Sequence, residues 1–268
     1  MNTETITSND SLITANTEQI LANQSLVYEA GQEAGQRAEC DKFWDNYQNY
    51  GNRTNYEMGF LGYGFNFNTF HPKYDIKPIG SGQKLFYAWN ISADSYDPAY
   101  RGSLKQRLEE CGVILDTSKV NCMTSMFRYG RWTELPTIDM TGLTTASDYI
   151  FANNYGALKT IEKIIIGNGT PIKRNWFGAN CQGLENLIIE GTIGKNGFDV
   201  QYQTELSGES IVSIIEALSS TASGLTVTLS QTAVDNITFP ITSTQTGTIY
   251  ASWDELVGTK TNWTIALA

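Results

Sequence analysis

FANNYGALKTIEKIIIG, residues 151–167, is echoed a short way downstream by FGANCQGLENLIIEG, residues 177–191. When the two stretches are set in register, three pairs of identical residues share one and the same spacing: Phe151 and Phe177, Asn154 and Asn180, and Leu158 and Leu184. Coincidence at a single spacing indicates an internal repeat.

The pattern extends upstream into TSMFRYGRWTELPTIDM, residues 124–140. The same spacing pairs the apolar residues of this stretch with those of the second unit: Leu135 with Ile161, and Ile138 with Ile164. The third unit, 177–191, lacks one residue before its strand. Further upstream, GVILDTSKV at 112–120 is expected to be the strand of another, imperfect unit.

Each unit carries the pattern L-x-x-[LI]-x-x-I-x-[IM], followed by Gly, Asn and Thr. Such a pattern predicts a short strand and then a turn. A period of about 20 to 29 residues with such a strand is typical of leucine-rich-repeat solenoids, whose stacked units bury one another's apolar faces. The expected fold class is therefore α+β and β-solenoid-like. It comprises a short leucine-rich-repeat array over residues 111–205, an N-terminal helix, and a C-terminal capping helix plus strands.

The spacing F-x-x-N-x-x-x-L, which starts at Phe151 and again at Phe177, resembles the BspA-type leucine-rich repeat. The resemblance implies that these two phenylalanines stack in a spine on the convex side of the array. It also implies that three further residues cap turns: Asn154, Asn180 and Cys181. The first unit departs from the pattern, because Ser125 stands where Phe is expected and Phe127 lies nearby.

Residues 206–268 are predicted to cap the C-terminal end of the array. Helical spacing of four apolar residues predicts a helix within 206–220: Ile211, Ile214, Ile215 and Leu218. Ser207 and Ser210 are its candidate caps. Apolar alternation predicts strands in GLTVTLSQTAV and in TNWTIALA, residues 261–268.

The N-terminal segment, residues 1–39, has apolar residues at a heptad spacing: Ile13, Ile20, Val27 and Ala34. This spacing predicts a helix with a seam for a partner. Gly31 and Gly35 each cost a helix about 1 kcal/mol relative to Ala, so a lone helix is not expected to be stable in water. Two hypotheses carry equal weight: an oligomerising or docking helix, or a helix that lies on its own domain.

Residues 40–110 are rich in aromatic residues and glycine and are expected to form a small β-containing domain. Six rings fit either a sugar-binding platform or, more commonly, a β core: Phe60, Tyr63, Phe65, Phe67, Phe70 and Tyr74. DKFWD at 41–45, NRTNY at 52–56 and KYDIKP at 73–78 resemble uncharacterised leucine-rich-repeat proteins encoded beside tail genes in phages and prophages of gut bacteria. That resemblance implies a virion context and no particular reaction.

Composition narrows the classes of function. The 28 acidic residues outnumber the 18 Lys and Arg, so a net charge of -10 disfavours nucleic-acid binding. The first residues lack the features of a secretion signal and no stretch is apolar enough to span a membrane, so neither export by the general route nor membrane insertion is expected. The four cysteines form no C-x-x-C pair and are expected to be buried free thiols: Cys40, Cys111, Cys122 and Cys181.

The sequence contains no catalytic signature. His71 is the sole histidine, and no nucleophile motif such as G-x-S-x-G accompanies it. Four carboxylates are the nearest candidates for a glycosidase acid and base, although such residues are usually solvated surface: Asp94, Asp97, Glu109 and Glu110. No enzyme activity, metal or cofactor is therefore expected.

The repeat itself favours display of a surface, because outward residues can vary without touching the core. Six residues of the strand windows are the outward candidates: Thr137, Asp139, Lys163, Ile165, Asn186 and Ile188. The leading hypothesis is a phage tail-tip or fibre-like virion protein, made in the bacterial cytoplasm, whose repeat face binds a bacterial surface protein or glycan. Its N-terminus would contact other virion proteins or further copies of itself, as in a trimer. Two alternatives stay open: a purely structural virion component, and a hydrolase of cell-wall or capsule glycan.

Overall fold

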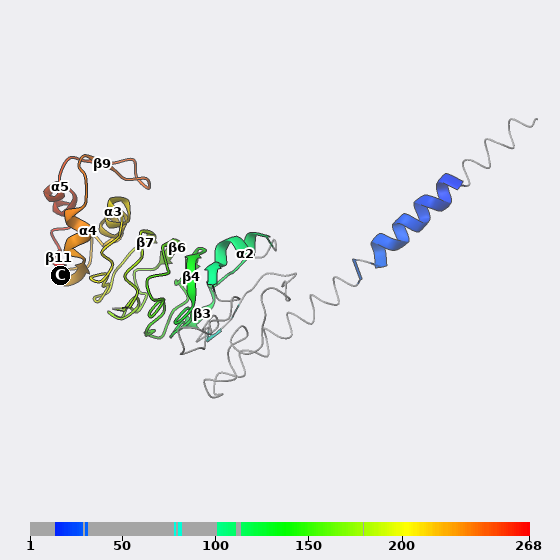
Figure 1. The fold of residues 1–268 in the computed structure, drawn as a ribbon, viewed down its shortest axis with the longest axis horizontal. Coiled ribbons are helices and arrows are strands. Elements are labelled where there is room, and N and C mark those ends of the chain that lie inside the picture. Colours follow the sequence, from blue (N-terminus) through cyan, green and yellow to red (C-terminus); the bar gives the residue numbers. More distant parts are fainter. Residues whose placement is uncertain are drawn as a thin grey trace, which may run out of the picture. The chain divides into compact units, whose positions relative to one another are not determined.

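The computed structural model describes residues 14–28, 30–31, 78, 80–81, 101–110, 114–178 and 180–268 (Figure 1). The chain divides into two compact units, Met1–Asn46 and Tyr47–Ala268. In the first unit, residues 14–28 form a helix whose residues are all exposed, Ile20 and Val27 among them. Several residues named in the predictions lie outside the described residues: Ile13, Ala34, Cys40, Cys111, His71, Asp94, Asp97 and the six rings between 60 and 74.

The second unit is built on a five-stranded parallel sheet. Its strands are β2 (Arg101–Ser103), β4 (Arg131–Leu135), β5 (Ile138–Asp139), β6 (Thr160–Ile166) and β7 (Asn186–Gly191). β2 pairs with β4, β4 and β5 both pair with β6, and β7 pairs with the other side of β6. Figure 1 shows β4, β6 and β7 side by side in chain order. Helix α2 (Leu104–Glu110) follows β2 directly.

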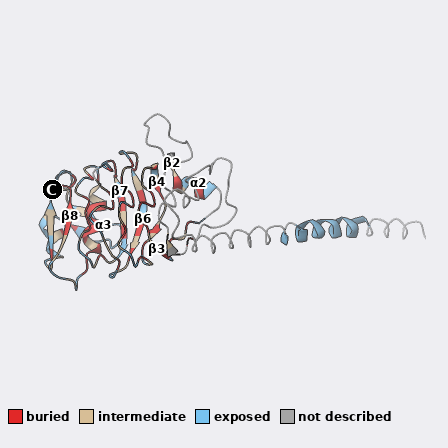
Figure 2. Cartoon of the chain, turned by 90° about the horizontal axis from the view of Figure 1, so that it is seen from below, coloured by how far each residue is buried: buried red, intermediate tan, exposed pale blue. Residues whose placement is uncertain are grey.

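The strands keep the sequence offset of the repeat. Leu135 lies opposite Ile161, and Ile161 lies opposite Leu187. All three side chains are buried beneath the sheet, and the buried positions run from strand to strand in Figure 2. Each such side chain contributes about 1.5 to 3 kcal/mol through burial, and it does so because units stand on either side of it.

Two local features break the regularity of the sheet. Pro136 separates β4 from β5, because proline has no N–H with which to continue the ladder. In the third unit, Ile188 alone stands between the pairs Ile161–Leu187 and Ile164–Ile189, where β6 has two residues, and the register between β6 and β7 shifts at this point.

The strand predicted over 112–120 is wrong in its position. Among the described residues of this segment, Leu115 forms a single bridge and residues 118–119 form a turn. The strand is β3 (Val120–Cys122), and it pairs with β1 (Gly80–Ser81) and not with the five-stranded sheet. Asp116 explains the change, because its carboxylate accepts from the backbone N–H and the hydroxyl of Ser118, which closes a turn.

A row of phenylalanines fills the side of the units opposite the sheet. Phe151 stacks on Phe177 with ring centroids 5.2 Å apart, and Phe127 stacks on Phe151 at 5.7 Å. Phe198 meets Phe177 edge-on at 6.3 Å. Phe127 thus supplies the ring that Ser125 does not. Phe127 and Phe151 are therefore separated by fewer residues in the sequence than the paired strand residues Leu135 and Ile161.

Side-chain hydroxyls cover the open edge of β7. Helix α3 (Gly208–Ala217) has Ser207 as its N-terminal cap and packs along that strand. Its Ser210 and Ser213 hydroxyls accept from the backbone N–H groups of Leu187 and Ile189 at 2.9 and 2.8 Å. The helix predicted within 206–220 therefore satisfies backbone N–H groups of β7 that could otherwise pair with another strand.

The C-terminal region packs beyond α3. β8 (Leu225–Leu229) and β11 (Trp263–Leu267), the two strands expected there, form a parallel pair. Between them lie four elements that were not predicted from the sequence: α4 (Gln231–Asp235), β9 (Ile241–Thr242), β10 (Ile249–Tyr250) and α5 (Trp253–Gly258). The Glu216 carboxylate at the end of α3 accepts from Ser243, Thr246 and Tyr250, and so holds the β9–β10 hairpin against the helix.

Candidate functional site: the outer face of the parallel sheet

The outer face of the sheet carries alternating lysines and glutamates. They define what we call the charged face: Lys105, Glu134, Lys159, Glu162, Lys163, Glu185 and Glu190. Two ion pairs join the second repeat unit to the third, Lys159 to Glu185 at 2.8 Å and Lys163 to Glu190 at 2.6 Å. The buried residues of each strand hold the backbone in place, and the ion pairs orient the exposed lysine and glutamate side chains.

At the other end of the charged face, one lysine serves two strands. Lys105, in the first turn of α2, lies 3.8 Å from Glu134 of β4 and 3.3 Å from Glu162 of β6. Ser103 donates to the second oxygen of Glu134 at 2.7 Å. The charged face therefore extends from β2 to β7 as a ladder of contacts within the chain.

These contacts shift two pKa values. The hydrogen bond to Glu162, together with its charge, raises the pKa of Lys105. Partial burial alone would raise the pKa of Glu162, but hydrogen bonds from Lys105 and Thr137 outweigh it, and this carboxyl has a pKa below its usual range. Both shifts favour the charged forms.

The six residues predicted to face outward occupy the strands in different ways. Thr137 donates to Glu162 from its N–H and its hydroxyl, both at 3.1 Å. Asp139 accepts from the N–H and hydroxyl of Thr141, so it shapes a turn. Asn186 is exposed, and Ile165 and Ile188 are half-buried. Lys163 is thus the one member of this set that forms an ion pair on the charged face.

Most of the charged face was not predicted from the sequence. Lys159 and Glu185 stand at the same spacing as Leu158 and Leu184, so the repeat register was a sufficient signal for that pair. Lys163 and Glu190 depart from this spacing, because Glu190 lies opposite Ile165 in the sheet and Lys163 reaches it diagonally across the two strands. Lys105 lies on a helix before the array, where no repeat register applies.

The residues predicted to cap turns behave differently from one another. Asn154 is buried and donates to the carbonyls of Phe127 and Phe151, which belong to successive units. Asn180, expected in the equivalent role, is instead exposed and lies 3.1 Å from the Asn153 amide. Cys181 is fully buried, and burial raises the pKa of its thiol to about 12.

The described candidates for acid–base chemistry are engaged elsewhere. Glu109 lies 3.7 Å from Lys105, and Glu110 accepts from Gln106 at 2.8 Å, both on the surface of α2. In the part of the chain that the structure describes, no group of three or more His, Cys, Asp or Glu is placed to hold a metal ion. None of the described helices is both long and apolar enough to cross a membrane.

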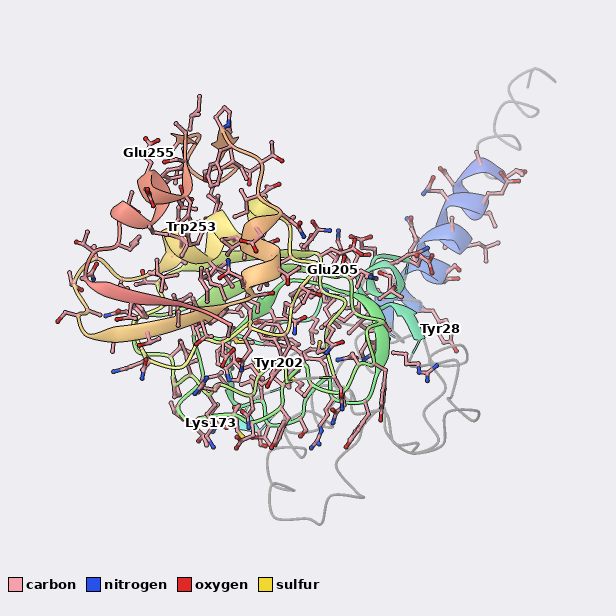
Figure 3. All side chains as sticks on the ribbon, turned by 60° about the vertical axis from the view of Figure 1, so that its left-hand side comes forward. Tyr28, Lys173, Tyr202, Glu205, Trp253 and Glu255 are labelled. Atoms are coloured by element: carbon pink, nitrogen blue, oxygen red, sulfur yellow. The ribbon has the colours of Figure 1, made fainter. Side chains whose placement is uncertain are left out.

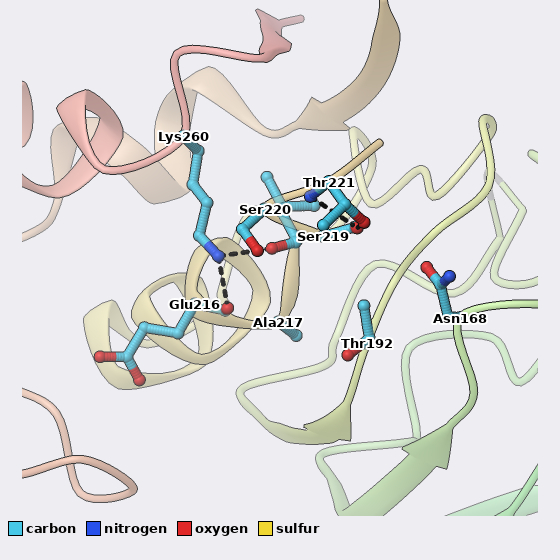
Figure 4. Close-up of a pocket in the computed structure, with 9 residues that line it drawn as sticks. Asn168, Thr192, Glu216, Ala217, Ser219, Ser220, Thr221 and Lys260 are labelled. Carbon is cyan, nitrogen blue, oxygen red and sulfur yellow. Dashed lines mark hydrogen bonds between the residues drawn. The ribbon is translucent and has the colours of Figure 1, made fainter. Parts of the chain in front are cut away.

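A pocket of about 400 Å³ opens between the turns after β6 and β7 and the end of α3 (Figure 4). Its one lysine, Lys260, donates to the backbone carbonyls of Glu216 and Leu218 and so caps the helix. Burial lowers the pKa of Lys260, although the Glu216 charge opposes the shift. The Glu216 carboxylate is bound to the β9–β10 hairpin. Both charged residues that line the pocket, Glu216 and Lys260, therefore have structural roles.

Comparison of the chain with protein-family models, with curated proteins and with solved structures finds no match in any of the three.

Proposed function

We propose that the chain is a non-enzymatic display protein of the leucine-rich-repeat type, in which the charged face binds a partner. The observation that carries the proposal is the ladder of ion pairs across successive units, from Lys105 to Glu190. The backbone beneath it is fixed by buried Leu and Ile, so the outer side chains are presented at regular intervals.

The ion pairs on this face are easily exchanged for contacts with a partner. Lys159 and Glu185 are each 46% exposed in their side chains. An exposed pair contributes only about 0.2 to 1 kcal/mol, so a partner that offers its own charges displaces it at little cost. Charged groups arranged in this way give specificity and a fast association rate more than they give affinity.

The size of the face implies that several copies act together. Adjacent strands lie about 4.8 Å apart, so four strand positions span about 15 to 20 Å, which is less than a standard interface requires. Copies joined together would raise the effective concentration of a weak site. The helix over residues 14–28 offers a means of joining them, because its Ile20 and Val27 are 56% and 73% exposed.

The biological setting that we propose is a phage virion, in which a tail-tip or fibre-like protein presents the charged face to a bacterial surface. The resemblance of residues 41–78 and the repeats to proteins encoded beside phage tail genes supports this setting. A purely structural virion component is the competing function, and cell binding distinguishes the two.

The test is binding of the purified full chain to cells of the host bacterium. A variant with both K163E and E190K keeps the ion pair while reversing its direction, so it preserves the fold and alters recognition. We expect this variant to bind at least 10-fold more weakly than wild type, while the control D254K, which changes a charge on α5, binds as wild type. Equal binding by the swapped variant would exclude the charged face, and no cell binding by the assembled wild-type chain would favour the structural component.

A further inference from the structure

A second exposed surface lies on the turns that precede β4 and β6 and on the first residue of β4. Six residues form it, and we call it the tyrosine–arginine cluster: Arg128, Tyr129, Arg131, Tyr149, Asn153 and Tyr155. Tyr149 is 40% exposed and Tyr155 is 52% exposed. We propose that this cluster binds an acidic saccharide, a sugar that carries a carboxylate. This surface is separate from the charged face, so its binding does not depend on the function proposed above.

The backbone holds three tyrosines in a conformation that tyrosine rarely adopts. Tyr129, Tyr149 and Tyr155 have φ values of 63°, 56° and 51°, in the left-handed region. Glycine and asparagine occupy that region at lower cost, whereas a bulky side chain there is unusual. Tyr129 N–H donates to the Ala152 carbonyl of the neighbouring turn, and Ala152 N–H donates to the Tyr149 carbonyl within its own turn. Strained residues of this kind cluster at ligand-binding sites, which makes these tyrosines candidates for contact with a ligand.

Arg128 is fixed between two of these rings. Its guanidinium carbon lies 4.6 Å from the Tyr129 ring centroid and 4.5 Å from that of Tyr149. Its Nη2 donates to the Tyr129 hydroxyl at 3.1 Å. Because a guanidinium can only donate, the Asn153 amide presents its oxygen, which accepts from Nε and Nη2 at 3.0 Å. These contacts use one edge of the guanidinium and leave Nη1 available to a ligand.

The local charge favours an anion, although the chain as a whole is strongly acidic. The tyrosine–arginine cluster contains two arginines and no carboxylate. Asp148, which directly precedes Tyr149, is engaged by Lys173 at 2.7 Å and by Asn175 at 2.8 Å. Burial alone would raise the pKa of Asp148, but these hydrogen bonds outweigh it and its pKa is lowered. Lys173 lies at the surface (Figure 3) and its charge balances that of Asp148, so the two arginines determine the local charge.

The ring arrangement favours a sugar over other anions. The Tyr129 and Tyr155 rings lie 6.4 Å apart and are inclined at 31°, with the Arg131 guanidinium 5.9 Å from the Tyr155 ring. An exposed aromatic face packs against the apolar C–H face of a pyranose ring, and tyrosine hydroxyls and asparagine amides bond its hydroxyl groups. A carboxylate on the same sugar pairs with Nη1 of Arg128, whose guanidinium the other contacts hold in place.

The test is titration of the full chain with a disaccharide that contains glucuronic acid, with its neutral glucose counterpart, and with a glutamate-rich peptide, each followed by calorimetry. We expect saturable binding of the acidic disaccharide at an affinity at least 10-fold above that of the neutral one, and no binding of the peptide. Binding of the peptide alone, or equal binding of the two sugars, would overturn the proposal.

Two variants test the residues. Y155G removes an exposed ring and replaces it with the residue that tolerates its backbone angle, so we expect sugar binding to fall at least 10-fold while the melting temperature stays equal or rises. R128Q removes the charge, and we expect it to abolish the preference for the acidic sugar. The charged-face variant K163E/E190K serves as the control and should bind the disaccharide as wild type. Unchanged binding in both Y155G and R128Q would overturn the proposal, whatever the charged-face variant does on cells.

Discussion

At the scale of single residues, the units approach so closely that some positions have no room for a side chain. A Cβ on Gly183 would lie 2.3 Å from the carbonyl oxygen of Gly156, one unit away. A Cβ on Gly169 would have nothing within 4 Å, and its backbone angle is ordinary. These two glycines offer a matched comparison.

We expect G183A to destabilise the protein by about 1 to 3 kcal/mol, because the added methyl forces two stacked backbones apart. G169A should leave the free energy of unfolding within about 1 kcal/mol of wild type or raise it slightly. Urea unfolding of the two variants measures the difference. Equal stabilities would mean that the 156 and 183 turns are not stacked.

Glu162 predicts a dependence of stability on pH. Its pKa is lowered from the ordinary value of 4.5. The charged carboxylate therefore contributes fully to the free energy of unfolding above pH 4.5, and this contribution is lost as the pH falls through the lowered pKa. The difference in free energy of unfolding between wild type and E162Q should therefore shrink below about pH 4.5. Because the pair is exposed, we expect at most about 1 kcal/mol at neutral pH.

The control for that measurement is E109Q, on the outer surface of α2. Glu109 lies 3.7 Å from the same lysine but is 65% exposed in its side chain. We expect its effect to be smaller than that of E162Q at every pH. An E162Q difference that does not change between pH 7 and pH 3 would contradict the role given to Lys105 and Thr137.

At the scale of elements, the contact between α3 and β7 ends the sheet. Ser213 accepts from the Ile189 N–H and receives a hydrogen bond from Gln245 at 2.9 Å. S213A would leave a buried N–H without its acceptor, so we expect a loss of about 1 to 3 kcal/mol. S220A, at an exposed position after the helix, should cost less than about 0.5 kcal/mol. Equal effects in thermal unfolding would show that the helix does not protect the edge.

The elements that could be predicted from sequence are those with strong periodicity. β6 contains Ile161, Ile164 and Ile166 on its buried side, and α3 has a continuous row of Ile residues. The strand expected before Val120 was misplaced because the Asp116 side chain closes a turn, a choice that hydrophobic pattern does not reveal.

The candidate sites were less predictable than the strands. The charged face depends on register, and Lys163 pairs diagonally with Glu190, which lies opposite Ile165 and not opposite Lys163. The tyrosine–arginine cluster unites Arg128 with Tyr149, which do not occupy equivalent positions of the repeat. They meet in the turns before the strands, where the first two units are closer in sequence than along their strands.

At the scale of the whole molecule, the exposed apolar residues of the N-terminal helix predict self-association. Ile20 and Val27 lie on one face of that helix, whereas Leu26, which is 63% exposed, lies on another. We expect light scattering of the full chain to give a multiple of 29.7 kDa, I20D/V27D to give the monomer mass, and L26D to keep the oligomer. A monomeric wild type, or dissociation by L26D alone, would contradict a seam through Ile20 and Val27.

The stacking of successive units, on which the proposed display depends, is tested most directly in the unmodified protein. A carbodiimide joins an amine to a carboxylate only where the two are in contact, and Lys159 lies 2.8 Å from Glu185, while Lys163 lies 2.6 Å from Glu190. Mass spectrometry of the digested product should find both of these cross-links. If Lys159 and Lys163 couple only to carboxylates of their own unit, the units are not stacked in the register described.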